Sequence, residues 1–170
     1  PKAVFNVFGD TEQVLHTECG IHDWQSETGI RKLYSLNKNY RNTAAIVEFC
    51  NQTFKSTMEY IGRVRRADMP HKVSDPMRMK AAVVTDDIVI IVRDRNALER
   101  FCASVGKPVS DFEYLDTKAE APSGRKIPCY SIFAAKGLEF RKVVVFPLNM
   151  TVNQKVVACT RAMEELYYYE

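Results

Sequence analysis

The sequence lacks long apolar runs, paired cysteines and an export signal. Its longest apolar runs, such as Ile88–Val92, are far too short to cross a bilayer. The five cysteines form no C-x-x-C pair, so neither a zinc site nor a redox motif is expected, and Cys50 and Cys102 fit the apolar faces of predicted helices as reduced core thiols. Residues 1–8 resemble an internal strand rather than a signal peptide. These absences predict a cytoplasmic protein with no membrane segment and no metal site.

The net charge is also small, because 24 basic and 21 acidic residues leave a formal net charge of only +3. Dedicated nucleic-acid binders usually carry a strongly basic face or tail, so the charge does not identify a partner. The 170 residues, of which 46% are hydrophobic and 26% charged, suit one soluble globular domain with a single core.

Short apolar runs alternate with amphipathic stretches, a pattern typical of strands buried on both faces by helices. The sequence therefore predicts an α/β fold with a mainly parallel sheet. The expected strands are residues 4–8, 32–36, 87–92, 129–133, 142–146 and 166–169. The expected helices are residues 43–61 and 96–105, and the expected loops are residues 62–82 and 118–126.

Two polar clusters lie in the first quarter of the chain. G-D-T-E-Q at residues 9–13 follows a predicted strand, and α/β sheets present ligand-binding groups at the carboxyl ends of strands. N-K-N-Y-R-N at residues 37–42 contains Tyr40, whose ring suits stacking on a base, and Arg41, whose guanidinium suits phosphate oxygens. Taken alone, each cluster is better explained by a structural role, the first as a tight turn and the second as a core tyrosine beside a surface arginine.

Two further clusters lie near the carboxyl terminus. In S-I-F-A-A-K-G-L-E-F, residues 131–140, small residues including Gly137 allow close approach of a ligand, and Glu139 can accept hydrogen bonds from ribose hydroxyls. V-A-C-T-R-A, residues 157–162, lies on a predicted helix that carries Arg161. Most arginines on helices only contact solvent, so Arg161 is a candidate site residue only in combination with the other three clusters.

In this order the four clusters resemble the motifs G-D-x-x-Q, N-Y-R, A-K-G-L-E-F and T-R-A of the UvrD/Rep branch of superfamily 1 helicases. The resemblance covers nearly the whole chain. In that family two RecA-like domains bind one ATP between them. The resemblance implies that residues 14–170 are the second RecA-like domain and that residues 1–13 form the junction with the first.

The resemblance also implies roles for the matched residues. Gln13 is expected to sense the γ-phosphate, and Arg41 and Arg161 are expected to reach it across the cleft between the domains. Tyr40 resembles the residue that stacks on adenine, and Glu139 the residue that holds the ribose. Arginines supplied across an interface in this way contribute about 10³ to 10⁵ in rate.

The implied cofactor is ATP with Mg²⁺, and the implied partners are single-stranded DNA and the protein's own N-terminal RecA-like domain. Gly137 is expected to pack near the phosphates and Ser131 to contact the DNA strand. Closing and opening of the two domains around ATP would then move them along that strand.

The sequence departs from the family in several places. It has no G-x-x-x-x-G-K-[ST] phosphate loop and no acidic strand end before Gly9, so the Mg²⁺ ligands are expected on the missing domain and this chain alone is expected to be inactive. Phe133 replaces a histidine found in many relatives, and the span from Arg41 to Ser131 is short for the usual accessory domain. These departures resemble the HelD-type relatives, which release RNA polymerase from nucleic acid. A degenerate interaction module that hydrolyses nothing is a third alternative.

Overall fold

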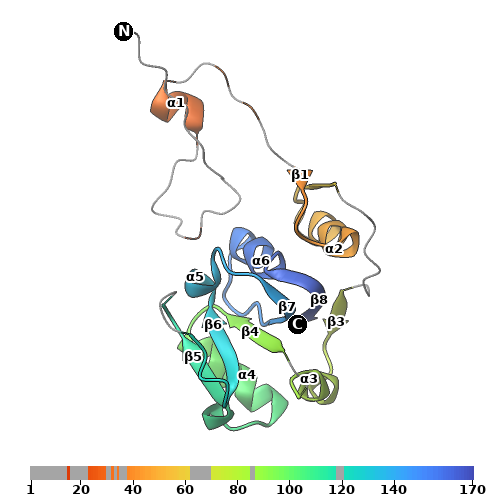
Figure 1. Cartoon of the computed structure of the whole chain (residues 1–170), viewed down its shortest axis with the longest axis vertical. Coiled ribbons are helices and arrows are strands. Elements are labelled where there is room, and N and C mark those ends of the chain that lie inside the picture. Colours follow the sequence, from red (N-terminus) through yellow and green to blue (C-terminus); the bar gives the residue numbers. More distant parts are fainter. Residues whose placement is uncertain are drawn as a thin grey trace.

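A six-stranded parallel sheet with helices on both faces forms the body of the protein (Figure 1). The computed structural model describes residues 15, 23–29, 32, 34, 38–61, 70–84, 87–117 and 121–170. In spatial order the strands are β3 (His71–Val73), β8 (Ala162–Tyr169), β7 (Phe140–Val145), β4 (Ile88–Val92), β6 (Ile127–Ser131) and β5 (Phe112–Leu115). The α/β class and the mainly parallel sheet predicted from the sequence are confirmed.

The sheet is buried on both faces, and alternate residues of each central strand serve opposite cores. In β4, Val89 and Ile91 join one core while Ile88, Ile90 and Val92 join the other. Successive side chains of a strand point to opposite faces, so a strand buried on both faces needs an apolar residue at every position. Helices α2 (Ala44–Phe54), α5 (Ile132–Ala135) and α6 (Val152–Cys159) contribute to the first core, and α3 (Pro76–Ala82) and α4 (Arg95–Val105) to the second.

Helix α4 has the bounds that its sequence signals indicate. Asp94 caps its start by accepting a 2.9 Å hydrogen bond from the Ala97 amide, and Gly106 ends it in the left-handed region at φ 62°. Glycine suits that conformation because it has no Cβ. The prediction of a helix at residues 96–105 is therefore confirmed.

Helix α2 is shorter than the predicted helix at residues 43–61, so that prediction was wrong at its carboxyl end. Thr43 caps the start by accepting a hydrogen bond from the Ile46 amide, but the helix ends at Phe54, and Lys55 adopts φ 61°. Beyond it, the Asn51 side-chain amide donates to the Met58 carbonyl at 2.8 Å and accepts from the Met58 amide at 3.1 Å. The chain then forms a short parallel pair, β1 (Lys38–Asn39) with β2 (Glu59–Tyr60).

Other predicted bounds also need correction. The stretch 62–82 was expected to be a surface loop, but its described part contains β3 and α3. Helix α3 begins there because Asp75 caps it and Pro76 is its first residue. The strand expected at residues 129–133 ends at Ser131, whose side chain caps α5. The helix expected to carry Arg161 ends at Cys159, and Ala162 already begins β8. Strand β5 was not predicted.

Several expectations fall wholly or mostly outside the described residues. These are the strand at 4–8, the junction at 1–13, and the strand at 32–36 apart from Lys32 and Tyr34, which lie in no strand. The remaining described elements are α1 (Trp24–Thr28) and a 3-10 turn at Val109–Asp111. Four cysteines, Cys50, Cys102, Cys129 and Cys159, are buried free thiols. Across the described ranges, no helix is long and apolar enough to span a bilayer.

Candidate nucleotide-facing site

Two of the sequence motifs meet where β7 and β8 begin. Phe140 and Ala162, the first residues of these parallel strands, are register partners, and the Phe140 amide donates a 2.9 Å hydrogen bond to the Arg161 carbonyl. The segment ending in Glu139 and the segment containing Arg161 therefore lie side by side at the amino edge of the sheet. This is a consequence of parallel pairing, which places the starts of neighbouring strands at one edge.

The N-Y-R-N turn joins the same edge through an ion pair. Arg41 Nε lies 2.5 Å from Glu139 Oε1, and each side chain is 43% exposed. Half-exposed ion pairs contribute little to stability because solvent screens them. The main consequence of this contact is structural. It places the Arg41 guanidinium beside the Glu139 carboxylate, although the two residues are distant in the sequence, and both groups are accessible to a ligand.

The local backbone presents Tyr40 and Arg41 outward. Asn39 Oδ1 accepts hydrogen bonds from the amides of Arg41 and Asn42, each at 3.0 Å, which closes a tight turn. Tyr40 lies at the tip of this turn with 67% of its surface exposed. An exposed tyrosine ring beside a half-exposed guanidinium offers a face for stacking and a donor for an anion.

Arg161 lies inside the domain rather than on its surface. It is 2% exposed, its Nε donates to the Val157 carbonyl at 3.1 Å, and its Nη1 donates to the Leu138 carbonyl at 3.2 Å. The guanidinium thus holds the turn that precedes Glu139. The predicted contact with a γ-phosphate stays a prediction.

The glycine predicted to approach phosphates lies in an exposed turn. Gly137 has φ 89°, a value that favours glycine, and the turn is closed by a 3.0 Å hydrogen bond from the Leu138 amide to the Ala135 carbonyl. It follows α5 and leads into Glu139, so Gly137 belongs to the same edge as the ion pair.

One predicted site residue, Ser131, does not lie at this edge. Ser131 ends β6 at the carboxyl edge of the sheet, is fully buried, and accepts a 3.2 Å hydrogen bond from the Ala134 amide. Gln13 lies outside the described residues. Of the predicted set, the structure therefore groups Tyr40, Arg41, Gly137 and Glu139 on the surface, with Arg161 beneath them.

The cysteine of the V-A-C-T-R-A segment is unsuited to nucleophilic attack. Cys159, next to the T-R-A segment, is fully buried, and burial raises its pKa well above the ordinary value, so the thiol is neutral and inert. Among the residues that the structure describes, no group of three or more His, Cys, Asp or Glu side chains could hold a metal ion.

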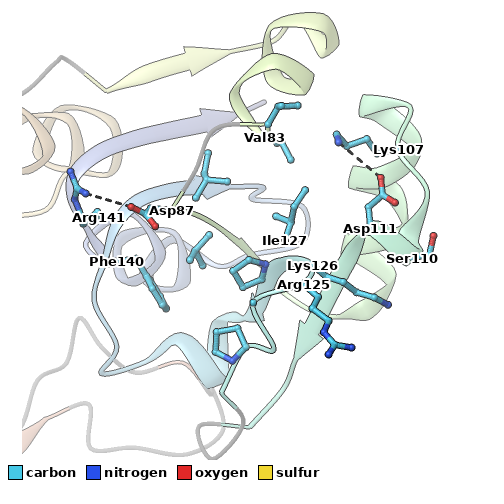
Figure 2. A pocket seen from close by; sticks show the side chains of 16 residues that line it. Val83, Asp87, Lys107, Ser110, Asp111, Arg125, Lys126, Ile127, Phe140 and Arg141 are labelled. Atoms are coloured by element: carbon cyan, nitrogen blue, oxygen red, sulfur yellow. Dashed lines mark hydrogen bonds and ion pairs between the residues drawn. The ribbon is translucent and has the colours of Figure 1, made fainter.

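A hollow of about 990 Å³ opens beside the site, where β4, β6 and β7 begin (Figure 2). Phe140 forms part of its wall. Two cations on its rim are already paired, Lys107 with Asp111 at 4.0 Å and Arg141 with Asp87 at 3.5 Å. Sequence reasoning missed this hollow because segments far apart in the chain line it, with no shared motif.

Sequence reasoning also missed Asn42, which is buried and ties the N-Y-R-N turn to the T-R-A segment. Its side-chain amide donates to the carbonyls of Thr160 at 2.9 Å and Ala162 at 2.7 Å. The available signal was the pair of asparagines three residues apart immediately before a helix, a spacing typical of side-chain-capped turns.

Comparison with known proteins finds similarity in structure. No family model and no curated protein matches the sequence. The structure is similar to the C-terminal domain of a possible DNA helicase from Lactobacillus plantarum WCFS1, with 19% identity over 77% of this chain and 86% of that chain and a TM-score of 0.56. Arterivirus nonstructural protein 10, a helicase solved with DNA, aligns at 18% identity over 81% of this chain and 26% of its own, with a TM-score of 0.42. The first likeness shows the fold: the chain has the RecA-like α/β architecture of that C-terminal domain.

Proposed function

We propose that this chain is the second RecA-like domain of an ATP-dependent DNA helicase or translocase. It would supply one side of an ATP site whose phosphate loop and Mg²⁺ ligands lie on another domain of the same protein. The observation that carries the proposal is the convergence of the N-Y-R-N, G-L-E-F and T-R-A segments on one edge of the sheet, joined by the contacts of Arg41, Asn42 and Arg161.

The residues at this edge fit a nucleoside triphosphate. Tyr40 offers an exposed ring for adenine, Glu139 offers acceptors for the ribose hydroxyls, and Arg41 offers donors for a phosphate. When ATP is bound, cleavage of its terminal phosphoanhydride supplies the free energy for domain movement. In the chain described here Arg41 and Glu139 neutralise each other, so engagement of a ligand would separate the pair and redirect Arg41 toward the facing domain.

The other matched residues enter the proposal differently. Gly137 leaves room beside the phosphates, and Gln13 would sense the γ-phosphate from the junction. Arg161 would have to leave the carbonyls of Val157 and Leu138 to act as a second arginine finger. A DNA contact at Ser131 would require α5 to move, because the Ser131 hydroxyl caps that helix.

The test uses the full-length protein and measures ATP turnover with and without single-stranded DNA. Arg41→Ala is expected to lower turnover about 100-fold, because charge neutralisation across the interface is lost. Arg100→Ala, at an exposed position on α4, is the matched control and should leave turnover unchanged. Equal turnover in Arg41→Ala and wild type would refute the assignment.

Nucleotide binding gives a second measurement on the same protein. Tyr40→Ala is expected to weaken binding of an adenine nucleotide about 10-fold, since stacking on a base contributes about 1 to 3 kcal/mol. Tyr34→Ala removes another exposed tyrosine, 80% exposed, and should have no effect. The alternative, a HelD-like remodeller, predicts copurification with RNA polymerase and little stimulation of turnover by DNA.

A further inference from the structure

The Asn42 side chain makes three hydrogen bonds, two of them as donor to buried backbone carbonyls. It is 3% exposed, and its Nδ2 donates to the carbonyl oxygens of Thr160 at 2.9 Å and Ala162 at 2.7 Å, residues 118 and 120 positions away in sequence. Its Oδ1 accepts a 2.8 Å hydrogen bond from Asn39 Nδ2. An amide has two donor hydrogens, and Asn42 uses both on carbonyls.

No other short side chain can replace asparagine at position 42 and keep these hydrogen bonds. A carboxylate of the same shape cannot donate and would face two carbonyl oxygens, and a serine hydroxyl has one hydrogen for two acceptors. Buried groups that lose a partner incur the full cost of desolvation. The position therefore requires an amide of this length.

The two asparagines also determine where Arg41 lies. Asn39 bonds the amides of Arg41 and Asn42 as well as the Asn42 side chain, so the turn and its anchor are one hydrogen-bonded unit. Arg41 directly precedes Asn42 in the chain, so this unit also sets the position from which Arg41 pairs with Glu139.

These contacts link the N-Y-R-N turn, the G-L-E-F segment and the T-R-A segment in a continuous network. Arg41 pairs with Glu139, whose neighbour Leu138 accepts from Arg161, and the carbonyls on either side of Arg161 accept from Asn42, the residue after Arg41. Each contact constrains the next, so displacing the Asn42 anchor displaces Arg41 from Glu139.

We infer that Asn42 is a positioning residue that holds Arg41 against Glu139 by fastening the N-Y-R-N turn to the segment Thr160–Ala162. Its effect on turnover rests on the function proposed above. Its effect on the position of Arg41 does not, because that effect follows from hydrogen bonds within this chain.

The first experiment follows the Arg41 Nε–H signal by NMR in the isotope-labelled 170-residue chain. The signal, assigned by its loss in Arg41→Ala, is expected to be displaced and protected from exchange by the Glu139 carboxylate. Asn42→Asp and the uncharged Asn42→Ser should both return it to the position of a solvated arginine. Asn51→Asp is the matched control, because Asn51 makes two side-chain hydrogen bonds to Met58 at the other end of α2.

An unchanged signal in both Asn42 variants, or an equal loss in Asn51→Asp, overturns the inference. The second experiment measures turnover in the full-length protein, where Asn42→Asp should lower kcat about 10-fold to 100-fold through misplacement of Arg41. In an Arg41→Ala background the same substitution should have no further effect, and a full additional loss there would overturn the inference. Absence of any turnover in the wild type would count against the proposed function alone, since the NMR result stands without it.

Discussion

Replacing Arg161 by alanine should destabilise the domain severely. The side chain makes two hydrogen bonds to backbone carbonyls, at 3.1 Å to Val157 and 3.2 Å to Leu138, while its 3.5 Å contact with the Thr160 hydroxyl is too long to add much. Hydrogen bonds with one charged partner contribute about 1.5 to 3 kcal/mol each, or about 3 to 6 kcal/mol for two. Freeing a buried arginine side chain returns up to about 2 kcal/mol of entropy.

The net expected loss is therefore about 1 to 4 kcal/mol, against the roughly 5 to 15 kcal/mol that stabilises a typical domain. In urea, where unfolding free energy falls by about 2 kcal/mol per M of denaturant, the unfolding midpoint of the 170-residue chain should fall by about 0.5 to 2 M. Arg161→Lys should retain about half of the stabilisation, because a single ammonium group reaches one carbonyl more readily than two.

Circular dichroism during urea titration is the assay, with Arg100→Ala as the exposed control, expected to lie within about 0.5 kcal/mol of wild type. A loss below about 1 kcal/mol in Arg161→Ala would refute the reasoning. It would mean that the guanidinium is not held by these carbonyls and is available to a ligand.

Three further predictions concern the core, a cap and the thiols. Phe101→Ala should cost about 3 to 5 kcal/mol of unfolding free energy, because the fully buried ring packs against three other aromatic rings. Thr151→Ala should cost about 1 kcal/mol by breaking the reciprocal capping of α6 with Gln154, and the same urea titration measures both variants. Burial raises the pKa of Cys102 to about 11, so at about pH 8 native protein should resist alkylation there, whereas unfolded protein should react readily, as peptide mass spectrometry can show.

The same pKa shift predicts a pH dependence of stability. A thiol whose folded pKa lies above its unfolded value contributes stability that is complete below the unfolded pKa. That contribution declines as pH rises from about 8.5 toward about 11, because the unfolded thiol ionises while folded Cys102 does not. Cys102→Ala should show a weaker loss of stability over this range in urea titrations at increasing pH.

Local patterns predicted those elements in which periodicity and end signals agree. Strand β4 and helix α4 are examples, the latter because Gly106 marks its end. The predicted helix at 43–61 was too long because Met58 and Ile61 continue the helical spacing and no glycine or proline stops it. Its actual end depends on Lys55 in the left-handed region and on Asn51, which holds the following loop.

The site shows the same division. The resemblance assigned Arg41 to the γ-phosphate and Glu139 to the ribose of a bound nucleotide, and it did not predict the ion pair that joins them in the structure. The burial of Arg161 was not predictable, since the side chain points inward only because the chain turns sharply between α6 and β8. The anchor role of Asn42 depends on carbonyls more than a hundred residues away, and a local pattern cannot identify such partners.

The place of β8 in the sheet has a consequence for biosynthesis. This strand lies between β3 and β7, so His71–Val73 has its only described strand partner in residues translated almost a hundred positions later. While those residues are still inside the ribosome, β7 in the nascent chain presents an unpaired edge that invites contact with other chains. Synthesis of β8 closes that edge and recruits β3 in one event, so the sheet is completed only when this strand emerges.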